Sequence, residues 1–232
     1  MTLPDRFKCI IVNWEYIYNL CRDVSSNVKD SDYQPELIIA LARGGWFAGR
    51  VMCDFLGLDS LTDLRIEHHS STITTGEETR VMYPLTENAI SGKRVLIIDD
   101  ILDTGKSVMN ARDHILQQEP QEVRTAALQY MYNSQIEPDY CGEHLEEWAW
   151  IVYPWNFIKD MTDIVSGLME RENIDIWDIP TIKHGLYEHH AIDPVSFEVA
   201  QPGRLTEILY EMERRGMVET IAIKGQTFWK KK

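Results

Sequence analysis

The chain has 232 residues, and its 37 acidic against 23 basic side chains give a formal net charge of −14. A hydrophobic fraction of 44% is enough to build a core, which excludes wholesale disorder. The acidic balance argues against a nonspecific binder of nucleic acid or anionic membranes, because such binding needs clustered cations. The length predicts one full domain with an appendage, or two small domains.

The four cysteines, Cys9, Cys21, Cys53 and Cys141, lie far apart and form no C-x-x-C motif. This spacing favours reduced thiols over a disulfide framework or a zinc site. No apolar run approaches the roughly 18 residues of a membrane span, and the mixed, charged start does not resemble a signal peptide. We therefore expect a cytoplasmic protein without a membrane partner.

The first part of the chain alternates helical and strand patterns. Apolar residues at helical spacing predict an amphipathic helix from about 11 to 28. A turn at Pro35 precedes five apolar residues, 37–41, which predict a strand buried on both faces, as in a parallel sheet. A second helix should then end at Gly57. Residues 66–80 are polar and predict a long loop or an irregular hairpin, the kind of segment that often covers a site.

The middle of the chain repeats the strand–helix–strand order. Residues 95–98 predict a buried strand, and a helix should run from 107 to about 118. Residues 123–131 and 148–153 predict two more strands. Alternation of this kind is typical of a parallel α/β sheet with right-handed crossovers.

Beyond about residue 160 the pattern changes. Helices are predicted at 160–171 and 203–215, followed by two short strands around a turn at Gly225. A helix followed by two strands resembles the end of a winged-helix unit. We therefore predict a main domain over residues 1–159 and a C-terminal accessory domain, helical or winged-helix-like, over residues 160–232.

One stretch carries most of the chemical information. The strand at 95–98 leads into Asp99 and Asp100, which places two carboxylates at the carboxyl edge of the sheet, where open α/β sheets bind ligands. The Thr-Gly-Lys-Ser turn at 104–107 follows at a helix start and supplies backbone amides, hydroxyls and the positive end of a helix dipole. Such a turn receives a phosphate without surplus basic residues.

The Gly105-Lys106-Ser107 sequence is not the end of a P-loop. That motif, G-x-x-x-x-G-K-[ST], needs a glycine at the position that Asp100 occupies. A carboxylate there would repel a triphosphate. A ligand that offers a phosphate to the turn and hydroxyl groups to the carboxylates fits better, and this description matches a phosphorylated sugar.

The stretch from Val95 to Ser107 resembles the signature by which type I phosphoribosyltransferases of the purine-salvage branch bind 5-phosphoribosyl-1-pyrophosphate (PRPP). The resemblance covers roughly residues 35–157. It implies a doubly wound parallel α/β sheet with a small hood built partly from residues 130–157. It also implies that the 5′-phosphate of PRPP is held by Asp103, Thr104, Gly105, Lys106 and Ser107.

The resemblance extends to the loop after the first buried strand. The family's pyrophosphate loop uses glycines that admit backbone amides to the diphosphate and an arginine that adds charge. The matching residues are Ala42, Arg43, Gly44 and Gly45, and Arg80 is expected to join them. The segment 70–80 resembles the mobile loop that closes over the reaction centre and excludes water.

The pairs His68-His69 and His189-His190 are weak candidates for metal ligands, because adjacent side chains diverge on a strand or a helix. His68 and His69 lie next to the expected lid. They are therefore candidates for substrate contact.

Trp148 to Asn156 resembles the base-binding strand of the xanthine-guanine enzymes of this family. The resemblance implies that Trp150 stacks on a purine, with Ile151 and Met131 beside the base. Met131 stands where 6-oxopurine enzymes have a lysine that donates to O6, and Asn156 where they have an aspartate near the magnesium pyrophosphate. Adenine has no O6 acceptor, so an adenine enzyme would not need this lysine. The identity of the base therefore remains open among adenine, hypoxanthine, guanine and xanthine.

The resemblance implies transfer of ribose 5-phosphate from PRPP to a purine base, which gives a purine nucleotide and pyrophosphate. Asp103 is then the catalytic base for the purine N7 proton. Asp99 and Asp100 hold the ribose hydroxyls, directly or through the implied cofactor Mg²⁺, and favour the positive charge of the transition state. The family also implies a homo-oligomer, at least a dimer.

A second hypothesis is a regulator that keeps the PRPP-binding fold as a sensor and binds nucleic acid with its C-terminal domain. The acidic composition and the intact Asp103 favour the enzyme. We therefore expect no nucleic-acid partner.

Overall fold

The computed structural model describes residues 5–70, 77–82, 85–86 and 89–232, and between 67 and 80 it describes only the main chain. Its internal contacts divide the chain into two compact units. The larger unit comprises residues 15–148, and the smaller unit combines residues 1–14 with residues 149–232.

A parallel sheet forms the centre of the larger unit. Within the described residues this sheet has five strands in the order β3-β2-β6-β7-β8, and every neighbouring pair is parallel. All of β2 is buried, as are the first apolar residues of β6, because crossover helices cover both faces. The strands are β2 (Leu37–Leu41), β3 (Leu61–Leu64), β6 (Arg94–Leu102), β7 (Glu122–Met131) and β8 (Tyr140–Leu145).

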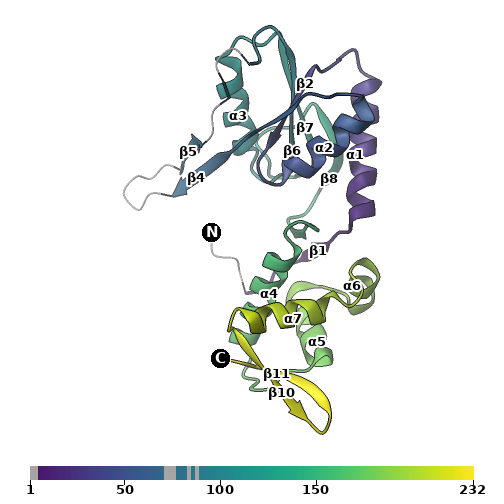
Figure 1. Cartoon of the computed structure of the whole chain (residues 1–232), viewed down its shortest axis with the longest axis vertical. Helices are drawn as coiled ribbons and strands as arrows, with labels where there is room; N and C mark the ends of the chain where they lie inside the picture. Colours follow the sequence, from purple (N-terminus) through teal and green to yellow (C-terminus); the bar gives the residue numbers. More distant parts are fainter. Residues whose placement is uncertain (1–4, 71–76, 83–84, 87–88) are drawn as a thin grey trace. The chain divides into compact units, whose positions relative to one another are not determined.

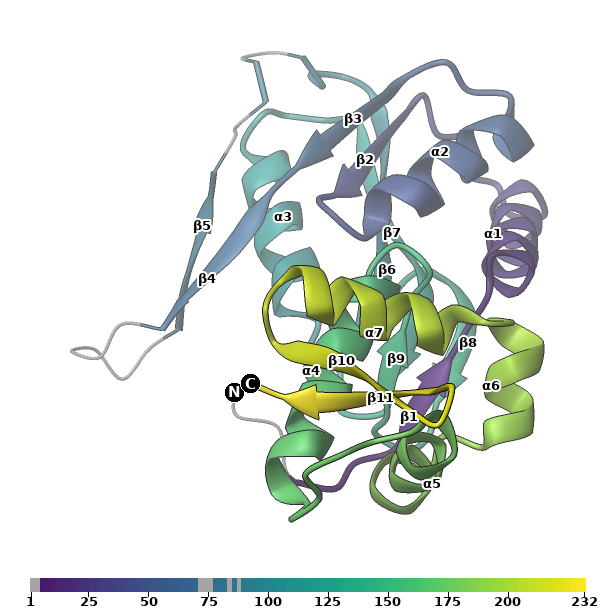
Figure 2. The same cartoon turned by 60° about the horizontal axis from the view of Figure 1, so that its bottom comes forward.

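Helices pack on both faces of this sheet. Helix α3 (Lys106–Leu116) lies on one face, and α1 (Trp14–Lys29) and α2 (Gly45–Leu56) lie on the other (Figures 1 and 2). Gly57 ends α2 in the left-handed region at φ 67°, as the sequence predicted. The doubly wound α/β fold that the sequence predicted is therefore confirmed.

Three details of this unit differ from the prediction. The first helix begins at Trp14 instead of residue 11, because Cys9–Ile11 forms a separate strand, β1. Strand β6 continues past Ile98 to Leu102, so the acidic pair lies inside the strand and not after it. Strands β3 and β8 were not predicted, since their sequences, LTDL and YCGEHL, lack a continuous apolar run.

The polar segment after β3 forms a hairpin of β4 (Ile66–Ser70) and β5 (Glu77–Val81), which pair antiparallel. The hairpin was one of the two predicted alternatives. Residues 71–76, the centre of the predicted lid, lie outside the described residues.

The smaller unit begins with a parallel pair of β1 and β9 (Trp150–Val152). The structure confirms the elements predicted for the C-terminal region. These are two helices, α4 (Phe157–Arg171) and α7 (Arg204–Arg214), and after them an antiparallel hairpin of β10 (Val218–Ile223) and β11 (Gln226–Lys231). The prediction missed α5 (Ile179–His190) and α6 (Pro194–Ala200). Both begin with an aspartate cap and an early proline, and their sequences, D-I-P-T and D-P-V-S, are recognisable start signals.

The described residues before α1 are part of the smaller unit. The Gln201 side-chain amide donates to the Val12 carbonyl at 3.0 Å, and the Trp150 N–H donates to the Lys8 carbonyl at 2.8 Å. The domain boundary predicted between residues 159 and 160 falls inside α4, and both it and the winged-helix likeness remain predictions. None of the described helices is both long and apolar enough to span a bilayer.

His190 fastens this N-terminal segment to α5. Its ring is 1% exposed and lies 4.4 Å from the Phe7 ring, and Nδ1 lies 3.3 Å from the Phe7 carbonyl oxygen. Burial is the main cause that lowers the pKa of His190 from 6.5 to about 4. The folded protein therefore binds this proton less tightly than the unfolded chain does.

We predict that His190 makes the fold sensitive to acid. Its contribution to stability is complete above pH 6.5 and falls by roughly 3 kcal/mol as the pH drops to about 4. His190→Phe should flatten this part of the curve of melting temperature against pH. The control His184→Gln changes an exposed histidine on the same helix and should keep the wild-type slope. An unchanged slope in His190→Phe would contradict the prediction.

Candidate functional site

Two neighbouring carboxylates lie near the carboxyl end of β6. Asp99 and Asp100 are both half-buried. The Asp100 N–H donates to Asp99 Oδ1 at 2.9 Å, and the Ile101 N–H donates to Asp100 Oδ1 at 2.9 Å. Each carboxylate is thus oriented by the backbone of the residue that follows it, and this ordering prepares both for a ligand.

A negative charge on Asp99 is unfavourable at this position. Burial raises the pKa of Asp99 well above its usual 3.8, and the negative charge of Asp100 raises it further. A cation, or hydroxyl groups that donate hydrogen bonds, would relieve this repulsion. The pair is therefore suited to a ligand that brings one or both.

The loop between β2 and α2 packs directly against the pair. A Cβ atom at Gly44 would lie 1.8 Å from Asp100 Oδ2, and one at Gly45 would lie 2.6 Å from the Ile98 carbonyl oxygen. A side chain at Gly45 would therefore clash with the main chain, and one at Gly44 would displace the Asp100 carboxylate. The structure therefore brings together the two segments, 42–45 and 99–100, that the sequence singled out separately. Arg43 in this loop is exposed, and its peptide bond with Ala42 is cis.

The turn after β6 encloses a pocket of about 160 Å³. Its lining includes Asp99, Asp103 and the whole of the predicted phosphate turn, Thr104, Gly105, Lys106 and Ser107. Gly105 has φ 75° and immediately precedes α3, whose N-terminus presents the positive end of the helix dipole. The arrangement is that of an anion site built from main-chain amides.

A second segment, absent from the sequence prediction, contributes to this turn. The loop after β7 contacts it at three positions: the Asn133 side-chain amide donates to Asp103 Oδ1 at 3.3 Å, the Gln135 N–H donates to the Thr104 carbonyl at 3.0 Å, and a Cβ atom at Gly105 would lie 2.8 Å from Ser134 Oγ. The available signal was the polar Asn-Ser-Gln run directly after a buried parallel strand, at the edge where ligands bind.

The residues expected at the base belong to two different units of the chain. Met131 ends β7 and is buried, with 3% of its surface exposed. Trp150, half-buried, and Ile151, buried, belong to β9 in the smaller unit. Arg80 pairs with Glu67 through the main chain of the hairpin, and its side chain lies outside the described part of the structure. The side chains of His68 and His69 also lie outside the described part of the structure.

The donor set agrees with a magnesium ion shared with a substrate. Among the described residues, no group of three or more His, Cys, Asp or Glu side chains gathers to hold a metal by itself. Mg²⁺ usually binds through one or two protein carboxylates and takes its other ligands from water and substrate phosphates. Asp99 and Asp100, which repel each other when both are charged, fit that role.

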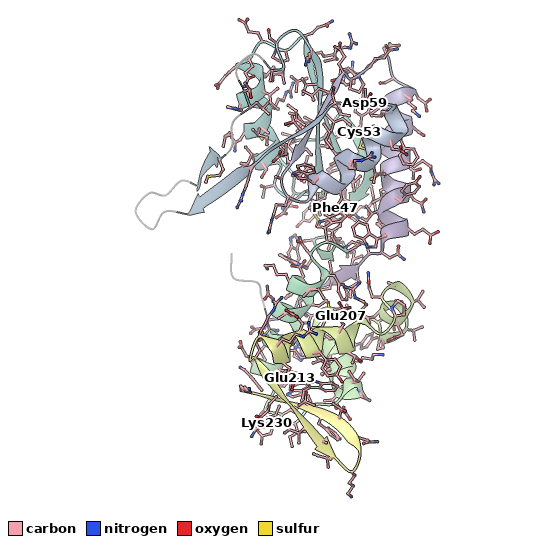
Figure 3. The ribbon with its side chains drawn as sticks, in the orientation of Figure 1. Phe47, Cys53, Asp59, Glu207, Glu213 and Lys230 are labelled. Atoms are coloured by element: carbon pink, nitrogen blue, oxygen red, sulfur yellow. The ribbon has the colours of Figure 1, made fainter. Side chains whose placement is uncertain are left out.

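A larger cavity of about 430 Å³ lies at the other end of α2. Cys53 and Asp59, two of its lining residues, are labelled in Figure 3. Its lining includes one arginine, Arg50, and two aspartates, a charge balance that does not favour an anion. The pocket at Asp103 combines amides, hydroxyls and carboxylates, and it is therefore the better candidate.

Comparisons with known proteins agree with this geometry. The family model "Phosphoribosyl transferase domain" matches residues 10–157. Hypoxanthine phosphoribosyltransferase of Escherichia coli is 26% identical over 113 residues, which cover 48% of this chain and 62% of that enzyme. Xanthine phosphoribosyltransferase 1 of Saccharomyces cerevisiae is 27% identical, over 40% of this chain and 53% of its own length. The chain thus spans less than two thirds of these curated relatives.

A solved structure of a purine phosphoribosyltransferase from Pyrococcus horikoshii superposes with a TM-score of 0.58 at 26% identity, over 63% of this chain and 93% of that one. The xanthine-guanine-hypoxanthine phosphoribosyltransferase of Helicobacter pylori has the same fold, with a TM-score of 0.55 at 16% identity over 67% of this chain and 99% of that one.

We predict that Asp99 destabilises the ligand-free fold at neutral pH. Because its folded-state pKa is raised, the folded protein holds this proton more tightly than the unfolded chain, and stability falls as the pH rises above 3.8. Asp99→Asn keeps an oxygen for the Asp100 N–H but carries no charge. In EDTA its melting temperature should exceed that of the wild type by a few degrees at pH 7.5, with the gain shrinking toward pH 4.

Asp113→Asn, which removes an exposed carboxylate from α3, is the matched control and should show no such pH-dependent gain. A destabilised Asp99→Asn at pH 7.5 would show that the pair is not repulsive.

Proposed function

Because the chain belongs to the phosphoribosyl transferase domain family, we propose that it transfers the 5-phosphoribosyl group of PRPP to a purine base. In this reaction the bond from C1′ to pyrophosphate breaks, a bond from C1′ to a purine nitrogen forms, and the purine loses a proton. The observation that carries the proposal is the shared pocket, in which a carboxylate of the acidic pair and the glycine-containing turn face the same space.

The turn would hold the 5′-phosphate. Thr104 and Ser107 offer hydroxyl groups, and the N-terminus of α3 offers amides and a positive dipole end. Binding of this kind needs little positive side-chain charge, which agrees with the net charge of −14. Lys106 adds one cation at the same place.

The acidic pair would serve the ribose. Carboxylates accept hydrogen bonds from the 2′- and 3′-hydroxyls and stabilise the positive charge that develops at C1′ when pyrophosphate departs. Magnesium bound at Asp99 or Asp100 would supply charge neutralisation for the pyrophosphate. The carboxylates themselves would orient the sugar, and a nearby cation would lower the raised pKa of Asp99.

The loop 42–45 would receive the pyrophosphate. Gly44 lies against Asp100, so a diphosphate in contact with this loop would also adjoin the ribose site. Arg43 is exposed and can add charge to the diphosphate. We assign the same role to Arg80, and we assign to the segment 70–80 the exclusion of water from the sugar cation.

Asp103 would accept the N7 proton of the purine as the new glycosidic bond forms. Trp150 would stack on the purine, with Ile151 and Met131 at its edge. The names of the relatives make hypoxanthine and xanthine the first candidates for the base. Adenine is the alternative, since Met131 stands where a lysine would donate to O6. We also propose that the chain acts as a homo-oligomer, at least a dimer.

The charges of α7 favour the enzyme over a nucleic-acid-binding regulator. Arg204 pairs with Glu207 at 2.6 Å, and Arg214 and Arg215 pair with Glu211 at 3.8 Å and 2.8 Å. Figure 3 labels Glu207 and Glu213 on this helix and Lys230 on β11. Because these arginines are neutralised by glutamates of the same helix, α7 does not present the clustered cations that binding to a phosphate backbone requires.

We predict that the full chain with PRPP and Mg²⁺ converts at least one of adenine, hypoxanthine, guanine and xanthine into its nucleotide, detected by mass together with released pyrophosphate. Gly105→Val should abolish PRPP binding in calorimetry, because a side chain there enters a space only 2.8 Å from Ser134 Oγ. The control Gly92→Val also sits at positive φ, 68°, but has open space around it.

Two results would contradict the proposal. PRPP affinity that survives Gly105→Val would place the phosphate elsewhere. Salt-sensitive DNA binding without turnover of any base would support the regulator.

We predict that Asp103→Asn lowers kcat by about 10²- to 10⁴-fold, the usual contribution of a general base, and changes the KM for PRPP far less. An amide keeps the shape of the carboxylate but cannot take the N7 proton. The control Asp113→Asn removes an exposed carboxylate of α3 and should leave both constants unchanged. Equal losses in kcat and in PRPP binding would show that Asp103 is not the base.

A further inference from the structure

The loop between β7 and β8 is held by several internal hydrogen bonds. The Ser134 N–H donates to the Met131 carbonyl at 3.0 Å, and the Ser134 hydroxyl donates to the Ile136 carbonyl at 2.7 Å. The Gln135 N–H then joins the loop to the Thr104 carbonyl at 3.0 Å. This loop is therefore a fixed support for the turn that carries Asp103.

Asn133 is the side chain of this loop that reaches the proposed base. Its Nδ2 lies 3.3 Å from Asp103 Oδ1. Both residues are exposed, so packing does not fix the rotamer of Asp103, and a hydrogen bond is the available means of orienting it. A donor on Oδ1 leaves Oδ2 to accept a proton.

We infer that Asn133 is a positioning residue that orients Asp103 for proton transfer; this inference rests on the proposed function. An amide is suited to the task because it donates a hydrogen bond without a positive charge. A cation in its place would stabilise the carboxylate and weaken it as a base. Besides Asp103, the charged side chains that line the pocket are Asp99 and Lys106. Through its contact with Asp103, Asn133 adds a neutral donor next to charges of both signs.

The test is a double-mutant cycle between Asn133 and Asp103, measured with the purine that the wild type uses best. Asn133→Leu removes the donor at nearly constant volume and should lower kcat roughly tenfold, the size of one hydrogen bond to a charged group, with little change in the KM for PRPP. Asn133→Gln keeps an amide and should recover part of the loss. In an Asp103→Asn background, Asn133→Leu should have no further effect on kcat, because a positioning residue acts only through the group it orients.

Gln135→Leu is the matched control. Gln135 lies in the same loop, its side chain is exposed, and its contact with Thr104 is through the main chain, so kcat should stay at the wild-type value. Melting temperatures of all variants, with and without PRPP, show whether the loop stays folded.

Three results would overturn the inference. An unchanged kcat in Asn133→Leu excludes any role for the amide. A tenfold loss that persists in the Asp103→Asn background shows a structural effect, which would also raise the KM for PRPP or lower the melting temperature. A wild type that converts no purine overturns the proposed function and this inference together, whereas a wild type that turns over and an inert Asn133→Leu overturn the inference alone.

Discussion

The close approach of Gly44 to the Asp100 carboxylate is the constraint on which the site depends. Strands β2 and β6 are neighbours in the sheet, with Ala40 beside Ile98. The chain that leaves β2 must therefore pass the residues that follow Ile98. A Cβ atom at Gly45 would lie 2.6 Å from the Ile98 carbonyl oxygen, and one at Gly44 would displace the Asp100 carboxylate. Parallel register and one missing side chain thus place a backbone loop, a pair of carboxylates and a helix start at one edge of the sheet. Such an edge is where open α/β sheets bind ligands.

The acidic pair lowers the stability of the fold and is explained by function. Two adjacent half-buried carboxylates, one of them with a raised pKa, would be removed if the fold alone were optimised. Local rules are broken most often where a protein works, and Asp99, with its raised pKa, is such a position here. The sheet around it has buried aliphatic strands and helices on both faces.

The sequence was sufficient for the parts of the fold whose signal is local. Continuous apolar runs identified β2 and β6, and the glycine at position 57 marked the end of α2. Strand β8 has no such run, because its stability comes from pairing with β7 and from the Tyr16–Glu143–Gln129 hydrogen bonds, which join residues distant in sequence. Asn133 was missed for the same reason. Its partner, Asp103, lies 30 positions away, and only the parallel crossover brings the two together.

The division of the chain links the proposed base-binding strand to the C-terminal region. Strand β9, which carries Trp150, is followed within a few residues by α4, whose first residue, Phe157, is fully buried. The Arg204 guanidinium of α7 lies 4.4 Å above the Phe157 ring, and the Phe197 ring of α6 lies 6.2 Å from it. The C-terminal helices therefore hold the start of α4, and through it the end of β9. Since β1 pairs with β9, the strand proposed to meet the purine is held both by this N-terminal strand and, through α4, by the C-terminal helices.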